Sequence, residues 1–153
     1  MEQYISYDSI LRDKELFTAG AYMMNDAKKH QIIAFHPGAM ASAAQIDIEH
    51  MVISEDIAYA LVGPNDSAAM FVTLEVCHAH QVPVFFDPGQ QLSLFSVEDL
   101  KRAFVFSTYL ICNDYEYALL QQRTGFTQEE MLSQLEKIVV TLGKDGVRLI
   151  DKN

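Results

Sequence analysis

The sequence lacks tryptophan and is short of positive charge. Only 11 Lys and Arg side chains stand against 21 Asp and Glu side chains in 153 residues, which gives a formal net charge of −10. Nucleic-acid surfaces need clustered Lys and Arg side chains to neutralise phosphates. The composition therefore argues against a nucleic-acid partner, and an anionic ligand has to be bound by local groups.

Cysteines and long apolar runs are also scarce. Cys77 and Cys112 each lie in an apolar segment, which favours two buried thiols in a reducing compartment over a disulfide. Residues 1–8 lack the basic and apolar regions of a signal peptide, and no stretch reaches the roughly 18 apolar residues of a membrane span. We therefore expect a cytoplasmic protein that is neither exported nor bound to a membrane.

Half of the residues are apolar, and neither a repeat nor a Pro/Gly/Ser-rich linker divides the chain. This predicts one globular domain. Apolar strands alternate with helical patterns, which predicts an α/β fold with a mostly parallel sheet and right-handed crossovers. The predicted strands cover 57–63, which we expect to be buried on both faces, 82–86, 104–112 and 137–142, and an antiparallel strand covers 147–150.

Helix-capping residues stand between these strands. Asp66 or Ser67 can cap one helix, Ser96 a second and Thr127 a third, and a further helix is predicted over 114–122. Near the N-terminus, 17–26 and 30–35 predict a β-hairpin that turns near 25–29 and is stopped by the sequence His-Pro-Gly at 36–38.

The residues that directly follow the parallel strands are the first candidates for a binding site. In open α/β sheets, ligands bind beyond the carboxyl ends of the strands. The polar and Gly-rich segments at these ends are Pro64-Asn65-Asp66, Asp87-Pro88-Gly89-Gln90, Asn113-Asp114-Tyr115-Glu116 and Thr141-Leu142-Gly143-Lys144-Asp145-Gly146.

Two of these segments each allow a structural and a functional interpretation. Asn113-x-x-Glu116 is a capping box, but an amide and a carboxylate at a helix N-terminus also suit magnesium and phosphate. Thr141-x-Gly143-x-x-Gly146 fits a hairpin turn, and Lys144 in it fits a phosphate contact or an exposed turn tip. The second segment matches neither the Walker A loop nor the dinucleotide-binding fingerprint.

Taken in order, the segments resemble the ribokinase-like (PfkB) carbohydrate kinase family and, within it, the adenosine-kinase branch. The resemblance covers nearly the whole chain at family-like spacing. It rests on Phe17-Thr-Ala-Gly-Ala-Tyr22, Gln31-Ile-Ile-Ala-Phe-His-Pro-Gly-Ala-Met40, Val84-Phe-Phe-Asp-Pro-Gly89, Asn113-Asp-Tyr-Glu116 and Val139-Val-Thr-Leu-Gly-Lys-Asp-Gly-Val147.

The resemblance implies a ribokinase-like fold and transfer of the γ-phosphoryl group of ATP to a hydroxymethyl group of a sugar or nucleoside, with Mg²⁺. By the resemblance, Asn113 and Glu116 position magnesium and phosphate. The nucleotide site takes Asn113, Thr141, Gly143, Lys144, Asp145 and Gly146, and weaker substrate contacts fall on His36, Asn65 and Asp87. His36 equally suits a loop-stabilising role, and Asp87 an Asp-Pro-Gly turn. Residues 17–38 would form a lid hairpin, and residues 56–153 the α/β core.

The sequence also departs from the family pattern. It contains neither the Gly-Gly substrate motif nor the Gly-Ala-Gly-Asp motif whose aspartate is the family's general base, so no residue is assigned as catalytic. We expect an internal portion of a kinase that is inactive alone and that either forms homo-oligomers or associates with the missing segments, because its sheet would keep an uncovered edge and face. The alternative is a non-catalytic nucleotide-binding or interaction module.

Overall fold

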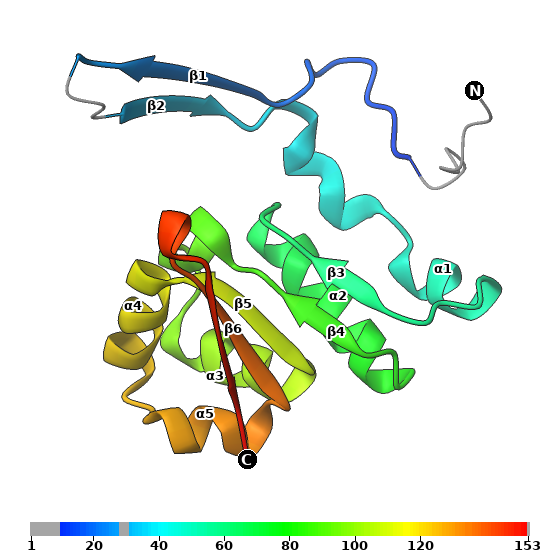
Figure 1. The fold of residues 1–153 in the computed structure, drawn as a ribbon. Helices are drawn as coiled ribbons and strands as arrows, with labels where there is room; N and C mark the ends of the chain where they lie inside the picture. Colours follow the sequence, from blue (N-terminus) through cyan, green and yellow to red (C-terminus); the bar gives the residue numbers. More distant parts are fainter. Residues whose placement is uncertain (1–9, 28–30, 153) are drawn as a thin grey trace, which may run out of the picture. The chain divides into compact units, whose positions relative to one another are not determined.

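The computed structural model describes residues 10–27 and 31–152 (Figure 1). The chain forms two compact units, residues 1–46 and residues 47–153. Within the described ranges, none of the helices has both the length and the apolar composition that crossing a bilayer requires.

The first unit contains the predicted hairpin. Strand β1 (Gly20–Asn25) pairs antiparallel with β2 (Gln31–His36), and a 3₁₀ segment η1 (Gly38–Gln45) follows. Gly38 has a φ of +50°, and a Cβ atom on it would lie 2.1 Å from the carbonyl oxygen of Phe17, so this position requires glycine. Residues 28 and 29 of the predicted turn at 25–29 lie outside the described residues.

The second unit is built on a five-stranded sheet in the order β3-β4-β5-β6-β7. The first four strands are parallel and β7 is antiparallel to β6, which confirms the predicted mostly parallel sheet. The strands are β3 (Ala60–Val62), β4 (Val84–Phe86), β5 (Tyr109–Asn113), β6 (Lys137–Thr141) and β7 (Val147–Asp151).

Four of the helices begin at predicted caps. The side chains of Asp66, Ser96, Asn113 and Thr127 each accept a backbone N–H of the first helical turn. The helices are α1 (Ile48–Ser54), α2 (Ser67–Ala79), α3 (Val97–Phe106), α4 (Asp114–Thr124) and α5 (Gln128–Gln134), with 3₁₀ segments η2 (Gly89–Ser93) and η3 (Gly143–Asp145).

Several elements differ from the prediction. The expected strand 104–112 was wrong at its start, because Leu100 and Phe104 are spaced as one helical face and are fully buried in α3, so that β5 begins at Tyr109. The helices η1 and α1 occupy a segment for which the sequence predicted no element. Strand β3 is also shorter than the predicted strand 57–63.

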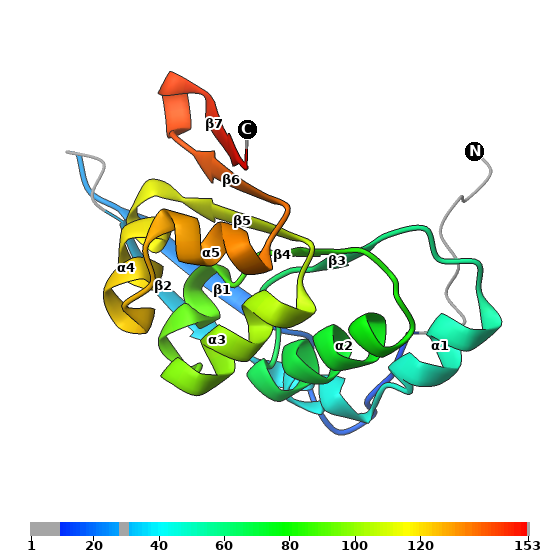
Figure 2. The same cartoon turned by 90° about the horizontal axis from the view of Figure 1, so that it is seen from below.

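The helices cover one face of the sheet. Figure 2 shows α2, α3, α4 and α5 on the same side of the sheet. The strand residues Val84, Leu110 and Ile138 are fully buried and belong to one hydrophobic core with residues of these helices. By contrast, the side chains of Leu61 in β3 and Leu149 in β7 are 72% and 67% exposed. The expectation that 57–63 is buried on both faces was therefore wrong, because within residues 47–152 only one face of the sheet is packed against helices.

Candidate functional site

Four of the predicted site residues meet at the carboxyl edge of the sheet. Asn113 is the last residue of β5 and stands in register with Thr141, the last residue of β6. Asp87 directly follows β4, and Glu116 lies in the first turn of α4. Together they line a cavity of about 280 Å³, whose walls are Pro64, Asp87, Gly89, Gln90, Ile111, Cys112, Asn113, Glu116 and Thr141.

Asn113 and Glu116 form the predicted capping box. The N–H of Glu116 donates to Oδ1 of Asn113 at 2.7 Å, and the N–H of Asn113 donates to Oε2 of Glu116 at 2.8 Å. Each cap bond uses one oxygen atom, and a carboxylate has two oxygens while an amide group also carries an NH₂ donor. The box therefore fixes both side chains at the mouth of the cavity while leaving them the chemistry that a ligand needs.

Asp87 is placed by the two loops that follow β3 and β4. Its N–H donates to the carbonyl oxygen of Val62 at 2.9 Å. Gly89 has a φ of +47°, and a Cβ atom there would lie 2.5 Å from Cγ of Pro64, so glycine permits the close approach of the two loops. Burial raises the pKa of Asp87, and the negative charge of Glu116 raises it further. A hydrogen bond from the backbone of Gly89 lowers this pKa and offsets part of the shift.

Thr141 connects β6 to β5 at the carboxyl edge of the sheet. Its hydroxyl donates to the carbonyl oxygen of Cys112 at 3.4 Å. The segment that follows it is a turn: Gly143 and Gly146 have φ of +57° and +94°, and the N–H of Leu142 donates to the carbonyl oxygen of Gly146 at 2.8 Å. Its geometry fits the hairpin interpretation, and Lys144 and Asp145 at its tip are exposed and do not line the cavity.

The donors around the cavity suit a hard cation. Carboxylate, amide and hydroxyl oxygens are the ligands that Mg²⁺ prefers, and a protein usually supplies one or two carboxylates while phosphates and water complete the shell. Within the described ranges, no cluster of three or more His, Cys, Asp or Glu side chains is arranged to hold a metal by itself. The residues present therefore fit Mg²⁺ that arrives with a phosphate ligand.

The two remaining candidates, His36 and Asn65, each make a local hydrogen bond in a loop. His36 belongs to the hairpin unit, where its Nδ1 accepts the N–H of Gly38 at 3.1 Å, which fits the loop-stabilising interpretation. Asn65 does not line the cavity, and its side-chain oxygen accepts the N–H of Asp66 at 2.8 Å. Both residues stabilise loops in the structure.

Several lining residues were missed by the sequence analysis. Gly89 and Gln90 were placed at a strand end without a role, and the Asp-Pro-Gly sequence is the signal that could have found them. Ile111 and Cys112 read as ordinary strand residues, and no sequence signal marks them. Burial raises the pKa of Cys112 to about 12, and the negative charges of Glu116 and Asp87 add to the shift. A raised pKa disfavours the thiolate, which is the reactive form of cysteine.

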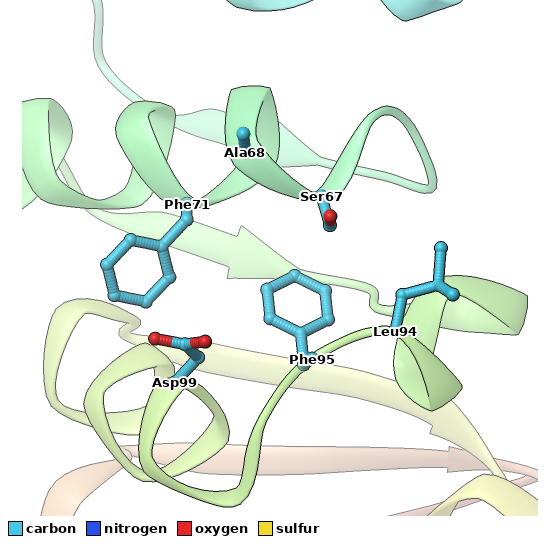
Figure 3. Close-up of a pocket in the computed structure, with 6 residues that line it drawn as sticks. All are labelled: Ser67, Ala68, Phe71, Leu94, Phe95 and Asp99. Carbon is cyan, nitrogen blue, oxygen red and sulfur yellow. The ribbon is translucent and has the colours of Figure 1, made fainter.

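A second cavity, of about 280 Å³, lies between α2 and the loop that leads into α3 (Figure 3). The rings of Phe71 and Phe95 face it, with the carboxylate of Asp99 below them; Ser67, Ala68 and Leu94 complete its lining. It is largely apolar, and Asp99 already accepts the hydroxyl of Ser96 at 2.7 Å. Its lining offers fewer converging polar groups than that of the first cavity.

Comparison with known proteins identifies a family. Residues 2–153 match the family model for pfkB family carbohydrate kinases. The solved structure of the nucleoside kinase of Burkholderia thailandensis in complex with inosine superimposes with a TM-score of 0.85 at 33% sequence identity, covering 91% of this chain and 46% of that chain. The structure of the same enzyme in complex with ADP-inosine gives a TM-score of 0.83 at 33% identity, over 91% of this chain and 43% of that one.

A curated relative agrees with this result. The nucleoside kinase of Thermoplasma acidophilum is 27% identical over 129 residues, which are 84% of this chain and 39% of the relative. The chain thus spans less than half the length of these relatives. Its α/β fold, with the parallel sheet, the flanking helices and the antiparallel hairpin, is that of the corresponding part of the Burkholderia enzyme.

Proposed function

The chain belongs to the pfkB family of carbohydrate kinases, and on that basis we propose that it forms the nucleotide-binding part of an ATP-dependent kinase. The kinase would transfer the γ-phosphoryl group to a hydroxymethyl group of a sugar or nucleoside. The observation that supports this most is the convergence of Asp87, Asn113, Glu116 and Thr141 on one cavity at the carboxyl edge of the sheet.

Phosphoryl transfer requires positioning and charge neutralisation more than covalent chemistry from the protein. In this proposal, Glu116 and Asp87 hold Mg²⁺, which neutralises phosphate charge when it is bound. Asn113 orients the phosphates at the N-terminus of α4, where the helix dipole favours negative charge. Thr141 and the amides of 143–146 line the nucleotide site, and Lys144 adds a point charge.

We propose a nucleoside as the acceptor in preference to a simple sugar. The support is that the Burkholderia relative, at 33% identity, was solved with inosine and with ADP-inosine. The sequence contains no Gly-Ala-Gly-Asp motif. We therefore propose that polypeptide outside these 153 residues supplies the general base, and we expect no turnover from this chain alone.

The test is the affinity of the full chain for Mg·ADP, measured by isothermal titration calorimetry. Glu116→Gln is the informative variant, because Gln at this position still completes a capping box but removes the charge. We expect its affinity to fall about tenfold or more, as for other losses of a group that organises a metal site.

Glu130→Gln is the matched control. Glu130 makes the same box at the start of α5, where its Oε2 accepts the N–H of Thr127 at 2.8 Å, and it does not line the cavity. Equal affinities of both variants and the parent chain would leave only the capping role for Glu116. Binding of Mg·ADP without turnover in the full-length kinase would favour the non-catalytic module.

A further inference from the structure

Arg123 joins α4 to the segment that follows β4. It lies in the last turn of α4, and its guanidinium group donates to two backbone carbonyl oxygens, those of Leu92 and of Phe95, the latter at 2.5 Å. Hydrogen bonds from a charged donor are stronger than neutral ones. The half-buried side chain of Arg123 therefore holds the stretch 92–95 against α4.

The segment held in this way leads to Asp87. Phe95 is 4% exposed, and its ring packs edge to face against the ring of Phe86 with the centroids 6.0 Å apart. Phe86 is the last residue of β4 and immediately precedes Asp87. At the other end of the same segment, Gly89 hydrogen-bonds to the Asp87 carboxylate.

The helix held in this way leads to Glu116. Arg123 follows Glu116 by seven residues, which is about 10 Å along an α-helix. Leu120, between the two, is fully buried, so this part of α4 is fixed in the core. Arg123, in the last turn of α4, thus joins the helix that carries Glu116 to the segment that follows Asp87.

We infer that Arg123 is a positioning residue of the candidate site, which sets the placement of Asp87 relative to Asn113 and Glu116 by fixing the η2 segment onto α4. The inference deepens the proposed function and rests on it for its consequence in nucleotide binding. The placement itself is a property of the chain without ligand.

The test compares backbone amide chemical shifts of the full chain and its Arg123→Ala variant by NMR. We expect the amides of Asp87, Gly89 and Asn113 to shift, although Arg123 contacts none of them in the structure. Arg123→Lys keeps the charge but cannot span two carbonyls, so we expect it to shift the same amides by a smaller amount. This variant replaces Arg123→Ala in the test if Arg123→Ala does not fold. Shifts confined to 92–95 and to the end of α4 would overturn the inference.

Arg102→Ala is the matched control. Arg102 also connects two elements, because it pairs with Glu75 at 2.6 Å and lies over the ring of Phe71, but it contacts no segment of the candidate site. Site amides that shift equally in this variant would also overturn the inference.

The consequence for binding is measured with Mg·ADP. We expect Arg123→Ala to weaken the affinity about fivefold, the low end of energetic coupling between separate sites. In an Asp87→Asn background we expect it to have no further effect, as a double-mutant cycle requires of a residue that acts through the placement of Asp87. An additive effect, or an unchanged affinity, would overturn the positioning role. Failure of the parent chain to bind Mg·ADP refutes the proposed function, and the amide shifts then decide the inference alone.

Discussion

At the scale of residues, the capping box of Asn113 and Glu116 reconciles two interpretations that the sequence leaves in competition. The hydrogen bonds of 2.7 and 2.8 Å establish the cap. The same two side chains also line a cavity with Asp87 and Thr141. A cap at a sheet edge therefore serves as a means of presenting polar groups, and the structural role does not exclude the proposed functional one.

A carboxylate that is positioned to bind a cation should destabilise the folded chain when no cation is bound. Because its folded-state pKa is raised, Asp87 contributes stability that is present below its unfolded pKa, near 3.8, and lost as the pH rises through the folded pKa. We predict that Asp87→Asn raises the melting temperature at pH 7, where the buried charge is removed, and that the gain shrinks as the pH approaches 3.8.

The measurement is thermal unfolding of both chains across this pH range, followed by circular dichroism. Asp56→Asn, at an exposed position of the same unit, is the control and should change little. A lower melting temperature for Asp87→Asn at pH 7 would show that the carboxylate stabilises the fold and would contradict the account.

Residue positions at strand ends could be predicted from the sequence because the rule about carboxyl ends of parallel strands is topological. Asp87, Asn113, Glu116 and Thr141 were all named on that ground or by resemblance. It could not be predicted that Cys112 lines the cavity, because this depends on how the loops after β3 and β4 pack. For the same reason, the hydrogen bonds of Arg123 could not be predicted from an isolated Arg near a helix end.

At the scale of elements, helix starts were the most predictable feature and short strands the least. Capping residues act within one turn of the chain, so that Asp66, Ser96 and Thr127 identify helix starts without tertiary information. The boundary between α3 and β5 depends on which apolar residues meet the core. A largely apolar run from 103 to 112, interrupted only by Ser107 and Thr108, hides it. Helix α1 was missed because none of its residues is buried.

The cap of α2 provides a prediction at this scale. The side chain of Asp66 accepts the N–H groups of Ala68 and Ala69 at 3.1 and 3.0 Å. We predict that Asp66→Ala lowers the free energy of unfolding by about 1 kcal/mol, the usual cost of losing such a cap. Urea denaturation measures it, with Asp56→Ala as the control. An unchanged midpoint would mean that the cap contributes nothing to the fold.

At the scale of the whole molecule, one face of the sheet is left without helices within residues 47–152. Parallel sheets normally have both faces covered, whereas here Tyr59, Leu61 and Leu149 are each more than 60% exposed. Tyr59, which directly precedes β3, contacts the ring of Phe85 in β4 with the centroids 6.0 Å apart, and Phe85 stacks on Tyr109 in β5 at 4.4 Å. Contiguous exposed apolar patches are typical of interaction surfaces.

We predict that the chain self-associates through this face when it is studied alone. Leu61→Lys combined with Leu149→Lys should raise the dissociation constant at least about tenfold, because exposed Leu side chains contribute roughly 2 kcal/mol each when they are buried. Val72→Lys, on the exposed surface of α2, is the control. Sedimentation velocity measures the association. A monomeric parent chain with a cooperative thermal transition would contradict the prediction.

The central claim, that the carboxyl edge of the sheet binds a magnesium nucleotide, is tested most directly by an NMR titration of the full chain with Mg·ADP. The account predicts that amide shifts concentrate at Asn113, Glu116, Thr141 and 143–146, and that the cavity between α2 and α3 in Figure 3 stays unchanged. Shifts centred on Phe71 and Phe95, or no shifts at millimolar nucleotide, would contradict it.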